Sequence, residues 1–92
     1  MADPLANTEA EAWLLGALMC LNPAIDAVAD IVTEADFSEQ LFGRIYAAIV
    51  REASLGKAAN PVTLKGYFEN DPALGELGGI GFLARLTGEV IP

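Results

Sequence analysis

Apolar residues recur at helical spacing along most of the chain, and no stretch alternates apolar and polar residues for long enough to predict a strand. The apolar stripes fall in five segments: 10–21, 25–32, 42–53, 64–68 and 80–86. Polar, Gly- and Pro-containing segments separate them. The pattern predicts an all-α fold, a compact bundle of about five short helices that forms a single domain over residues 1–92.

Polar residues at the segment boundaries predict where the helices begin. Thr8 and Glu11 have the spacing of a capping box, so the first helix is expected to start at Thr8. Asn22-Pro23 and Asn60-Pro61 each place a good N-cap residue before a proline at the first helical position. Ser38 is expected to cap the third helix.

The first helix is apolar on both sides. Its predicted buried stripe consists of Ala10, Trp13, Leu14, Ala17, Leu18 and Leu21. Leu15, Met19 and Cys20 lie on the back of the same helix, and Cys20 is interpreted as a small core hydrophobe. A helix that is apolar all round is either central to a bundle or covered by a second chain. Leu15 and Met19 are therefore a candidate self-association face, and the sequence leaves open whether they meet a neighbour or the chain's own fold.

The charge is unevenly distributed along the sequence. The chain has 92 residues with 13 acidic and 5 basic side chains, and residues 1–43 carry eight of the acids and no base. Phosphate-binding clusters of Lys and Arg are missing, so we expect no direct nucleic-acid binding. One cysteine and no histidine argue against a zinc site and against histidine-dependent catalysis. The acidic half is either functional or only solubilising.

The sequence also predicts a cytoplasmic location without membrane association. The N-terminus lacks the basic region of a signal peptide. The longest charge-free apolar run, 12–21, has ten residues and is too short to span a bilayer. A lone cysteine suits a reducing compartment.

Three features have the composition of a chemical site, and each has a plainer structural interpretation. The Gly78-Gly79-Ile80-Gly81 run fits neither phosphate-loop pattern and is interpreted as a tight turn. The carboxylate pairs are expected on solvated helix faces, and most aromatic residues on core stripes. Phe82 is the exception, because Ile80 and Leu83 already define an inward face for the last helix. No catalytic, cofactor-binding or metal-binding residue is predicted.

Six groups of residues, in order from Asn7 to Leu86, resemble the N-terminal domain of bacterial replicative DNA helicases of the DnaB type. They are Asn7-x-Glu9-Ala10-Glu11 with Leu14-Leu15-Gly16-Ala17-Leu18, Ile25-Asp26-x-Val28-Ala29, Glu34-x-Asp36-Phe37, Arg44-Ile45-Tyr46-x-Ala48-Ile49, Pro61-Val62-Thr63-Leu64, and Leu77-Gly78-Gly79-Ile80-x-Phe82-Leu83-x-x-Leu86. The sequence departs from the family pattern at Phe42, where a histidine is frequent, and at Trp13, which is bulkier than usual.

The resemblance implies a non-catalytic assembly and protein-interaction module. Such domains form the N-terminal tier of a hexameric ring and dock the helical C-terminal domain of primase. A helical hairpin and a RecA-like ATPase domain, which uses ATP and Mg for 5'-3' unwinding, follow in the family and are absent from these 92 residues. On this interpretation Phe82 and Arg85 of the last helix are the expected partner contacts, and the isolated domain is monomeric or weakly dimeric. The alternatives are a stand-alone helical adaptor or helicase regulator with the same fold, and a small enzyme.

Overall fold

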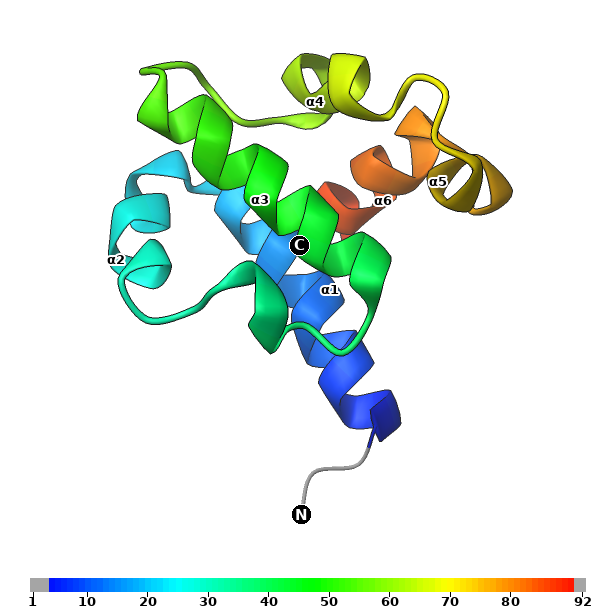
Figure 1. Cartoon of the computed structure of the whole chain (residues 1–92), viewed down its shortest axis with the longest axis horizontal. Helices are drawn as coiled ribbons and strands as arrows, with labels where there is room; N and C mark the ends of the chain where they lie inside the picture. The colour runs from blue at the N-terminus through cyan, green and yellow to red at the C-terminus, as the bar shows by residue number, and fades with distance from the viewer. Residues whose placement is uncertain (1–3, 91–92) are drawn as a thin grey trace.

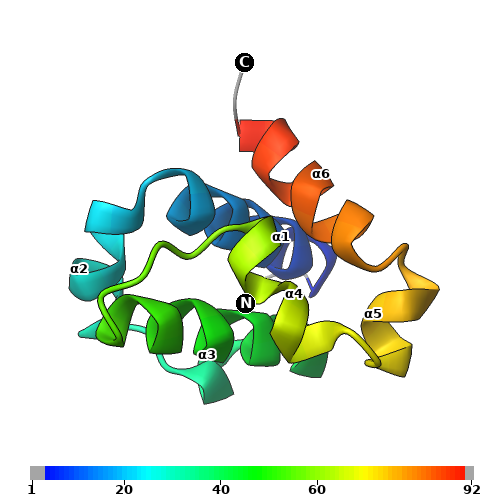
Figure 2. The same ribbon diagram turned by 90° about the horizontal axis from the view of Figure 1, so that it is seen from above.

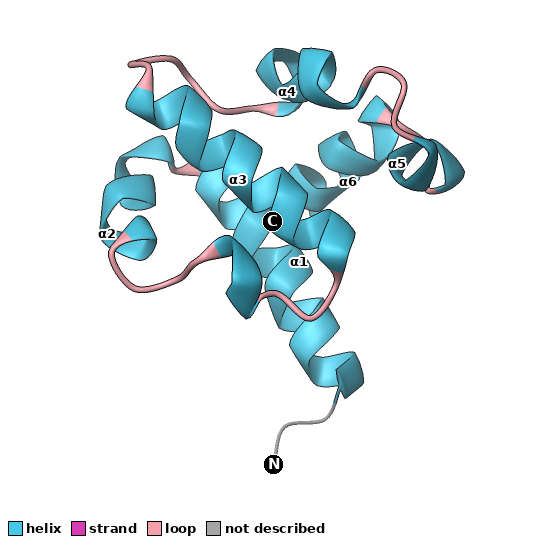
Figure 3. Ribbon diagram, in the orientation of Figure 1, coloured by secondary structure: helices cyan, strands magenta, loops and turns pink. Residues whose placement is uncertain are grey.

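Every regular element is helical in the part of the chain that the computed structural model describes, residues 4–90, with side chains described for residues 8–88 (Figure 3). The α-helices are α1 Pro4–Cys20, α2 Ile25–Ala29, α3 Gln40–Ser54, α4 Pro61–Phe68, α5 Pro72–Glu76 and α6 Ile80–Val90. Two short 3₁₀ turns, η1 Asn22–Ala24 and η2 Glu34–Asp36, flank α2. The all-α prediction is confirmed, and residues 1–3 and 91–92 of the predicted domain lie outside the described part.

Helix α1 runs through the middle of the molecule. It packs against α3 on one side and against α6 on another, and the views in Figures 1 and 2 show α3 crossing α1 while α4 lies between α3 and α6. The shorter α2 flanks α3 at the opposite side of the molecule from α5. The most deeply buried large side chains come from all six helices: Leu15, Leu18, Ile25, Ile45, Ile49, Leu64, Leu74 and Leu83. They form one hydrophobic core.

The start of α1 differs from the prediction. The helix begins at Pro4, where the fixed φ of proline suits a first helical residue, so Thr8 lies inside the helix and does not cap it. The Glu11 carboxylate instead accepts hydrogen bonds from the backbone N–H of Ser38 at 2.9 Å and from its hydroxyl at 2.8 Å. Ser38 is therefore not the cap of α3, which begins at Gln40. Glu11 ties α1 to the segment that leads into α3.

Two Asn-Pro pairs look alike in the sequence but differ in the structure. Asn60 caps α4 as predicted, since its side-chain oxygen accepts from the N–H groups of Val62 and Thr63. Asn22 makes no such cap. Its amide nitrogen donates to the carbonyls of Leu18 and Ala59 at 2.9 and 3.0 Å, and its oxygen accepts from the N–H of Ala59 at 2.8 Å. Asn22 thus joins the end of α1 to the segment before α4.

The buried face of α1 also differs from the prediction. Leu15 and Met19 are 0 % and 6 % exposed and belong to the hydrophobic core. The proposal of a self-association face at these two residues was wrong, because they meet the chain's own fold. In contrast, Trp13 and Leu21, which were expected inside, are 56 % and 61 % exposed. The side chain of Tyr67 on α4 is exposed as well.

The turn-rich segment after α4 contains a helix that the sequence pattern did not predict. Asp71 caps α5, and its Oδ1 accepts from the N–H groups of Ala73 and Leu74 at 3.0 and 3.2 Å. Leu74 is fully buried and holds α5 to the core. Gly78 and Gly79 then take positive φ values of 109° and 63°, which confirms the predicted tight turn before α6.

Candidate functional site

Phe82 and Arg85, the two predicted partner contacts, lie together on α6. The Phe82 ring stacks on the buried Phe42 ring of α3, with centroids 6.2 Å apart and an interplanar angle of 19°. The guanidinium carbon of Arg85 lies 5.8 Å from the centroid of the Phe82 ring, and its Nη2 donates to the carbonyl of Leu77 at 2.8 Å. Arg85 therefore ties α6 to the end of α5 while staying exposed at the surface, whereas Phe82 packs against α3.

An ion pair connects α3 to the start of α5. The Arg44 guanidinium pairs with the Asp71 carboxylate, and a second hydrogen bond between Nη2 and Oδ1 measures 3.4 Å. The hydrogen bond from Arg44 lowers the pKa of Asp71 below its usual value, with smaller contributions from the N–H groups that it caps. The same contact raises the pKa of Arg44. Asp71 is thus a cap and an ion-pair partner at once.

Asp71 also borders a small cavity between α4, α5 and α6. Its volume is about 170 Å³, and its apolar wall consists of Phe68, Leu74, Ile80 and Leu83. Lys65, Glu69 and Asp71 supply its polar edge. This volume is well below the range of drug-sized ligand pockets, roughly 300–1,000 Å³.

The turn η2 lies unusually close to α3. A Cβ atom at Gly43 would lie 2.8 Å from the Glu34 carbonyl oxygen, so only glycine allows this approach. A capping box closes η2: the Thr33 N–H donates to the Asp36 carboxylate at 2.7 Å. The Tyr46 hydroxyl of α3 donates to a carbonyl just before η2, that of Val32, at 2.6 Å. These contacts hold Glu34 against the outer side of α3.

Tyr46 itself is buried. Its ring lies 5.1 Å from that of Phe37, measured between centroids. Burial, and to a lesser degree the negative charge of Asp36, raises the pKa of Tyr46, so its hydroxyl remains a hydrogen-bond donor at neutral pH.

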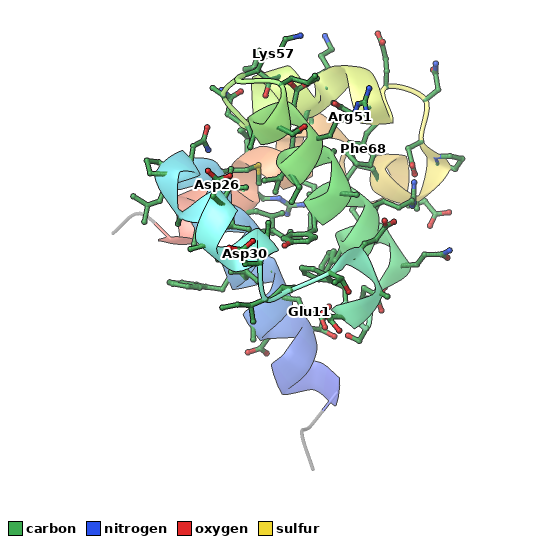
Figure 4. The ribbon with its side chains drawn as sticks, turned by 60° about the vertical axis from the view of Figure 1, so that its left-hand side comes forward. Glu11, Asp26, Asp30, Arg51, Lys57 and Phe68 are labelled. Carbon is green, nitrogen blue, oxygen red and sulfur yellow. The ribbon has the colours of Figure 1, made fainter. Side chains whose placement is uncertain are left out.

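The sequence analysis missed one buried carboxylate. Glu52 on α3 is only 7 % exposed, and its Oε2 has no hydrogen-bond partner among the described residues. Its position, three residues after the buried Ile49, was the available signal. Asp26 on α2 and Asp30 directly after it form one of the carboxylate pairs expected on a solvated face, and both are exposed (Figure 4).

The described part of the chain contains neither a cluster of metal-ligating side chains nor a single helix that could span a membrane. Within it, no three His, Cys, Asp or Glu side chains gather in a way that would hold a metal ion. No single described helix is long and apolar enough to cross a membrane. Only the pair Thr8–Cys20 and Asn22–Ala29, bent by 115°, meets the length and composition criteria jointly.

Comparisons with known proteins agree on one family. The family model described as the DnaB-like helicase N terminal domain matches residues 3–92. Over 81 residues the chain is 32 % identical to "Replicative DNA helicase DnaB" of Rickettsia conorii and 33 % identical to that of Rickettsia prowazekii, covering 88 % of this chain and 16 % and 17 % of those relatives. It is 29 % identical over 87 residues to "Replicative DNA helicase DnaC" of Bacillus subtilis, covering 95 % of this chain and 19 % of that relative. No solved structure matches it significantly.

Proposed function

The chain belongs to the DnaB-like helicase N-terminal domain family, and from this premise we propose that it is a non-catalytic assembly and protein-interaction domain of a replicative DNA helicase. The match of the family model over residues 3–92 carries the proposal. The domain contributes to the organisation of a hexameric ring and docks the helical C-terminal domain of primase during DNA replication in the cytoplasm. It holds no cofactor itself, and ATP and Mg are used by a separate ATPase domain of the helicase.

Exposed apolar side chains support an interaction role. Trp13, Leu21, Ile31 and Val62 are all more than half exposed, and the exposure of Ile31 reaches 80 %. Tryptophan is among the residues that contribute most to protein interfaces. Leu15 and Met19 are buried, so among the described residues the large apolar side chains available for self-association near α1 are Trp13 and, just after the helix, Leu21.

The charge of the domain supports a protein partner over a nucleic acid. The formal net charge of −8 repels phosphate. Among the described residues only two basic side chains, Arg44 and Arg51, line a common hollow, and Asp71 pairs with Arg44 there. An acidic domain of this kind attracts a basic partner and speeds association at low ionic strength.

A titration of the 92-residue chain with the C-terminal helical domain of primase from the same organism tests the proposal. We expect saturable binding by isothermal calorimetry, weaker at high salt, and no measurable nucleic-acid binding in a parallel titration. Sedimentation of the chain alone should show a monomer or weak dimer, since an interface below about 1,200 Å² associates weakly. Absence of primase binding at all protein concentrations tested would remove the docking role.

The predicted contact pair can be tested in the same titration. Phe82→Ala should weaken primase binding if α6 forms the contact, and the free energy of unfolding of the variant must be measured alongside, because Phe82 also packs on Phe42. An affinity and a stability both equal to those of the unaltered chain would refute a role for Phe82. Arg85→Ala provides the matched test of the neighbouring charge.

A further inference from the structure

Three hollows adjoin one another along the outer side of α3, and Glu34 lines all three. The first, of about 350 Å³, lies between α2, η2 and α3. The second, of about 250 Å³, lies between η2, α3 and α4. The third, of about 580 Å³, follows η2 to the start of α3. We refer to these three hollows together as the α3 trough.

The walls of the α3 trough are largely apolar. Where the first two hollows meet, they share Ala47, and Val50 extends the same side of α3 by almost one turn. The remaining apolar walls are supplied by neighbouring elements: Ala29, Val32, Ala35, Phe37, Tyr67 and Phe68. Small and half-buried residues on α3 leave room for the ridge of another helix.

The acidic side of the α3 trough has no counter-charge in its own segment. Residues 26–39 contain five acids and no base. The Asp36 carboxylate is engaged by Thr33, whereas the Glu34 carboxylate has no hydrogen bond or ion pair with any residue that the structure describes. Of the two arginines that line the trough, Arg44 is held by Asp71.

Arg51 lines the first two hollows of the α3 trough, as Glu34 does. Figure 4 shows it near Phe68. Arg51 makes no ion pair within the described residues. The trough therefore has a largely apolar lining, the Glu34 carboxylate at its junction, and two guanidinium groups, of which Arg44 is neutralised by Asp71 and Arg51 is not.

We propose that the α3 trough is a docking site for an amphipathic helix of a basic partner protein, with a Lys or Arg side chain of that helix paired with Glu34. The apolar ridge of the helix lies over Ala47 and Val50, as in helix-in-groove recognition. A charge-assisted hydrogen bond to Glu34 sets the register of the helix. The inference rests on the proposed function as an interaction domain and specifies the surface and the chemistry of the partner.

Charge identifies a basic partner and disfavours a second copy of the chain. Two copies, each with a net charge of −8, repel each other, and a copy whose acidic α2 approached this acidic edge would add to the repulsion. A cationic helix instead neutralises carboxylates that the domain leaves unpaired. Burial of its apolar ridge adds a contribution that salt does not screen.

A synthetic helical peptide of about five turns, built from leucine and lysine with leucines on one face, serves as the probe. It is titrated into the isotope-labelled chain, and amide chemical shifts map the contact. We expect the largest shifts in 29–34 and 43–54, and weaker binding as the salt concentration rises. The same peptide with glutamate in place of lysine should not bind.

Glu34→Gln removes the carboxylate charge without changing the size of the exposed side chain, so the fold should be retained. We expect it to weaken peptide binding about fivefold to tenfold, the range for one charge-assisted contact. Glu76→Gln on α5 is the matched control, an exposed carboxylate outside the trough, and should leave the affinity unchanged. Ala47→Arg, which places bulk and a charge of the same sign as the peptide in the trough, should also weaken binding.

Three results would overturn the docking site. These are an absence of lysine-peptide binding, shifts centred on Trp13 or on the cavity between α4 and α6, and equal weakening by the Glu34 and Glu76 variants. The primase titration separates this inference from the proposed function. Primase binding that is insensitive to Glu34→Gln counts against the trough alone, whereas trough-directed peptide binding without any primase binding counts against the docking of primase alone.

Discussion

Replacing Asn22 by alanine tests whether this residue is a link between two segments or an ordinary helix cap. Its side chain makes three hydrogen bonds of 3.0 Å or less, one to the carbonyl of Leu18 and two to the backbone of Ala59. Ala59 is fully buried, so water cannot replace the lost partners of its N–H and carbonyl groups. The alanine variant therefore loses three bonds and leaves buried polar groups without partners.

The size of the effect distinguishes the two roles. Loss of an N-cap costs about 1 kcal/mol of unfolding free energy. The Asn22→Ala change removes net contributions of roughly 1 kcal/mol per hydrogen bond and leaves a buried N–H that costs about 1–3 kcal/mol on its own. These overlapping terms give a destabilisation of roughly 2–4 kcal/mol. At about 4–8 °C per kcal/mol for a domain of this size, the midpoint of thermal unfolding should fall by at least about 8 °C.

Urea unfolding followed by far-UV circular dichroism measures the free energy, and hydrogen exchange measures the protection of the Ala59 amide. Asn70→Ala is the control, because Asn70 is an exposed asparagine between α4 and α5. We expect Asn22→Ala to lower both the unfolding free energy and the protection of Ala59, and Asn70→Ala to change neither appreciably. A loss for Asn22→Ala below about 1 kcal/mol with the Ala59 amide still protected would refute the link and restore the cap interpretation.

Two further changes test the position of η2 and the attachment of α5. Gly43→Ala should destabilise the domain by about 1–3 kcal/mol in the same urea assay, because its Cβ would meet the Glu34 carbonyl. Gly66→Ala, the control at an open helical position, should stabilise the domain by about 0.5–1 kcal/mol. Equal effects of the two changes would contradict the close approach of η2 to Gly43. Arg44 lowers the pKa of Asp71 in the folded state. The stability that Asp71 contributes is therefore present above about pH 4 and is lost as the pH falls through the lowered pKa. Asp71→Asn should make the unfolding free energy less dependent on pH in this acidic range.

Helical periodicity predicted the fold class and most of the core because both depend on short-range spacing. The stripe on α3 is confirmed, with Phe42, Ile45, Tyr46 and Ile49 all buried. Gly56, with a φ of 74°, follows the end of that helix, where glycine is the usual residue. The helix α5 was missed because it has five residues and contributes a single buried side chain, which is too short for a periodic signal.

Capping predictions failed where a polar side chain reaches outside its own helix. Glu11 has the spacing of a capping box but bonds to Ser38, 27 residues away along the chain. Asn22 has the composition of a cap but bonds to Ala59, 37 residues away. Local spacing cannot distinguish a cap from a tertiary contact, because the same acceptor oxygen serves both. The faces of α1 were assigned incorrectly for a related reason, since a helix that is apolar all round gives no direction to its neighbours.

The candidate surfaces also differ in whether they depend on short-range spacing or on tertiary contacts. Phe82 and Arg85 lie together on α6 because their three-residue spacing is within one helical turn, and their contact with a partner stays a prediction. The α3 trough depends on the approach of η2 to Gly43, a tertiary contact between segments that the sequence pattern leaves unplaced. Its functional role in binding a basic helix remains a proposal that the peptide titration tests.

The uneven charge of the sequence separates into two groups of acids once the structure is considered. The carboxylates of Glu11 and Asp36 accept hydrogen bonds from backbone N–H groups and hold segments together. Asp26, Asp30 and Glu34 make no ion pair in the described part of the chain, and no base in their half of the sequence can neutralise them. The first group acts on the stability of the fold, whereas the second raises the electrostatic free energy of the unbound domain. A basic partner relieves that repulsion, so the unpaired acids favour association. This contribution weakens as the salt concentration rises, because salt screens the charges.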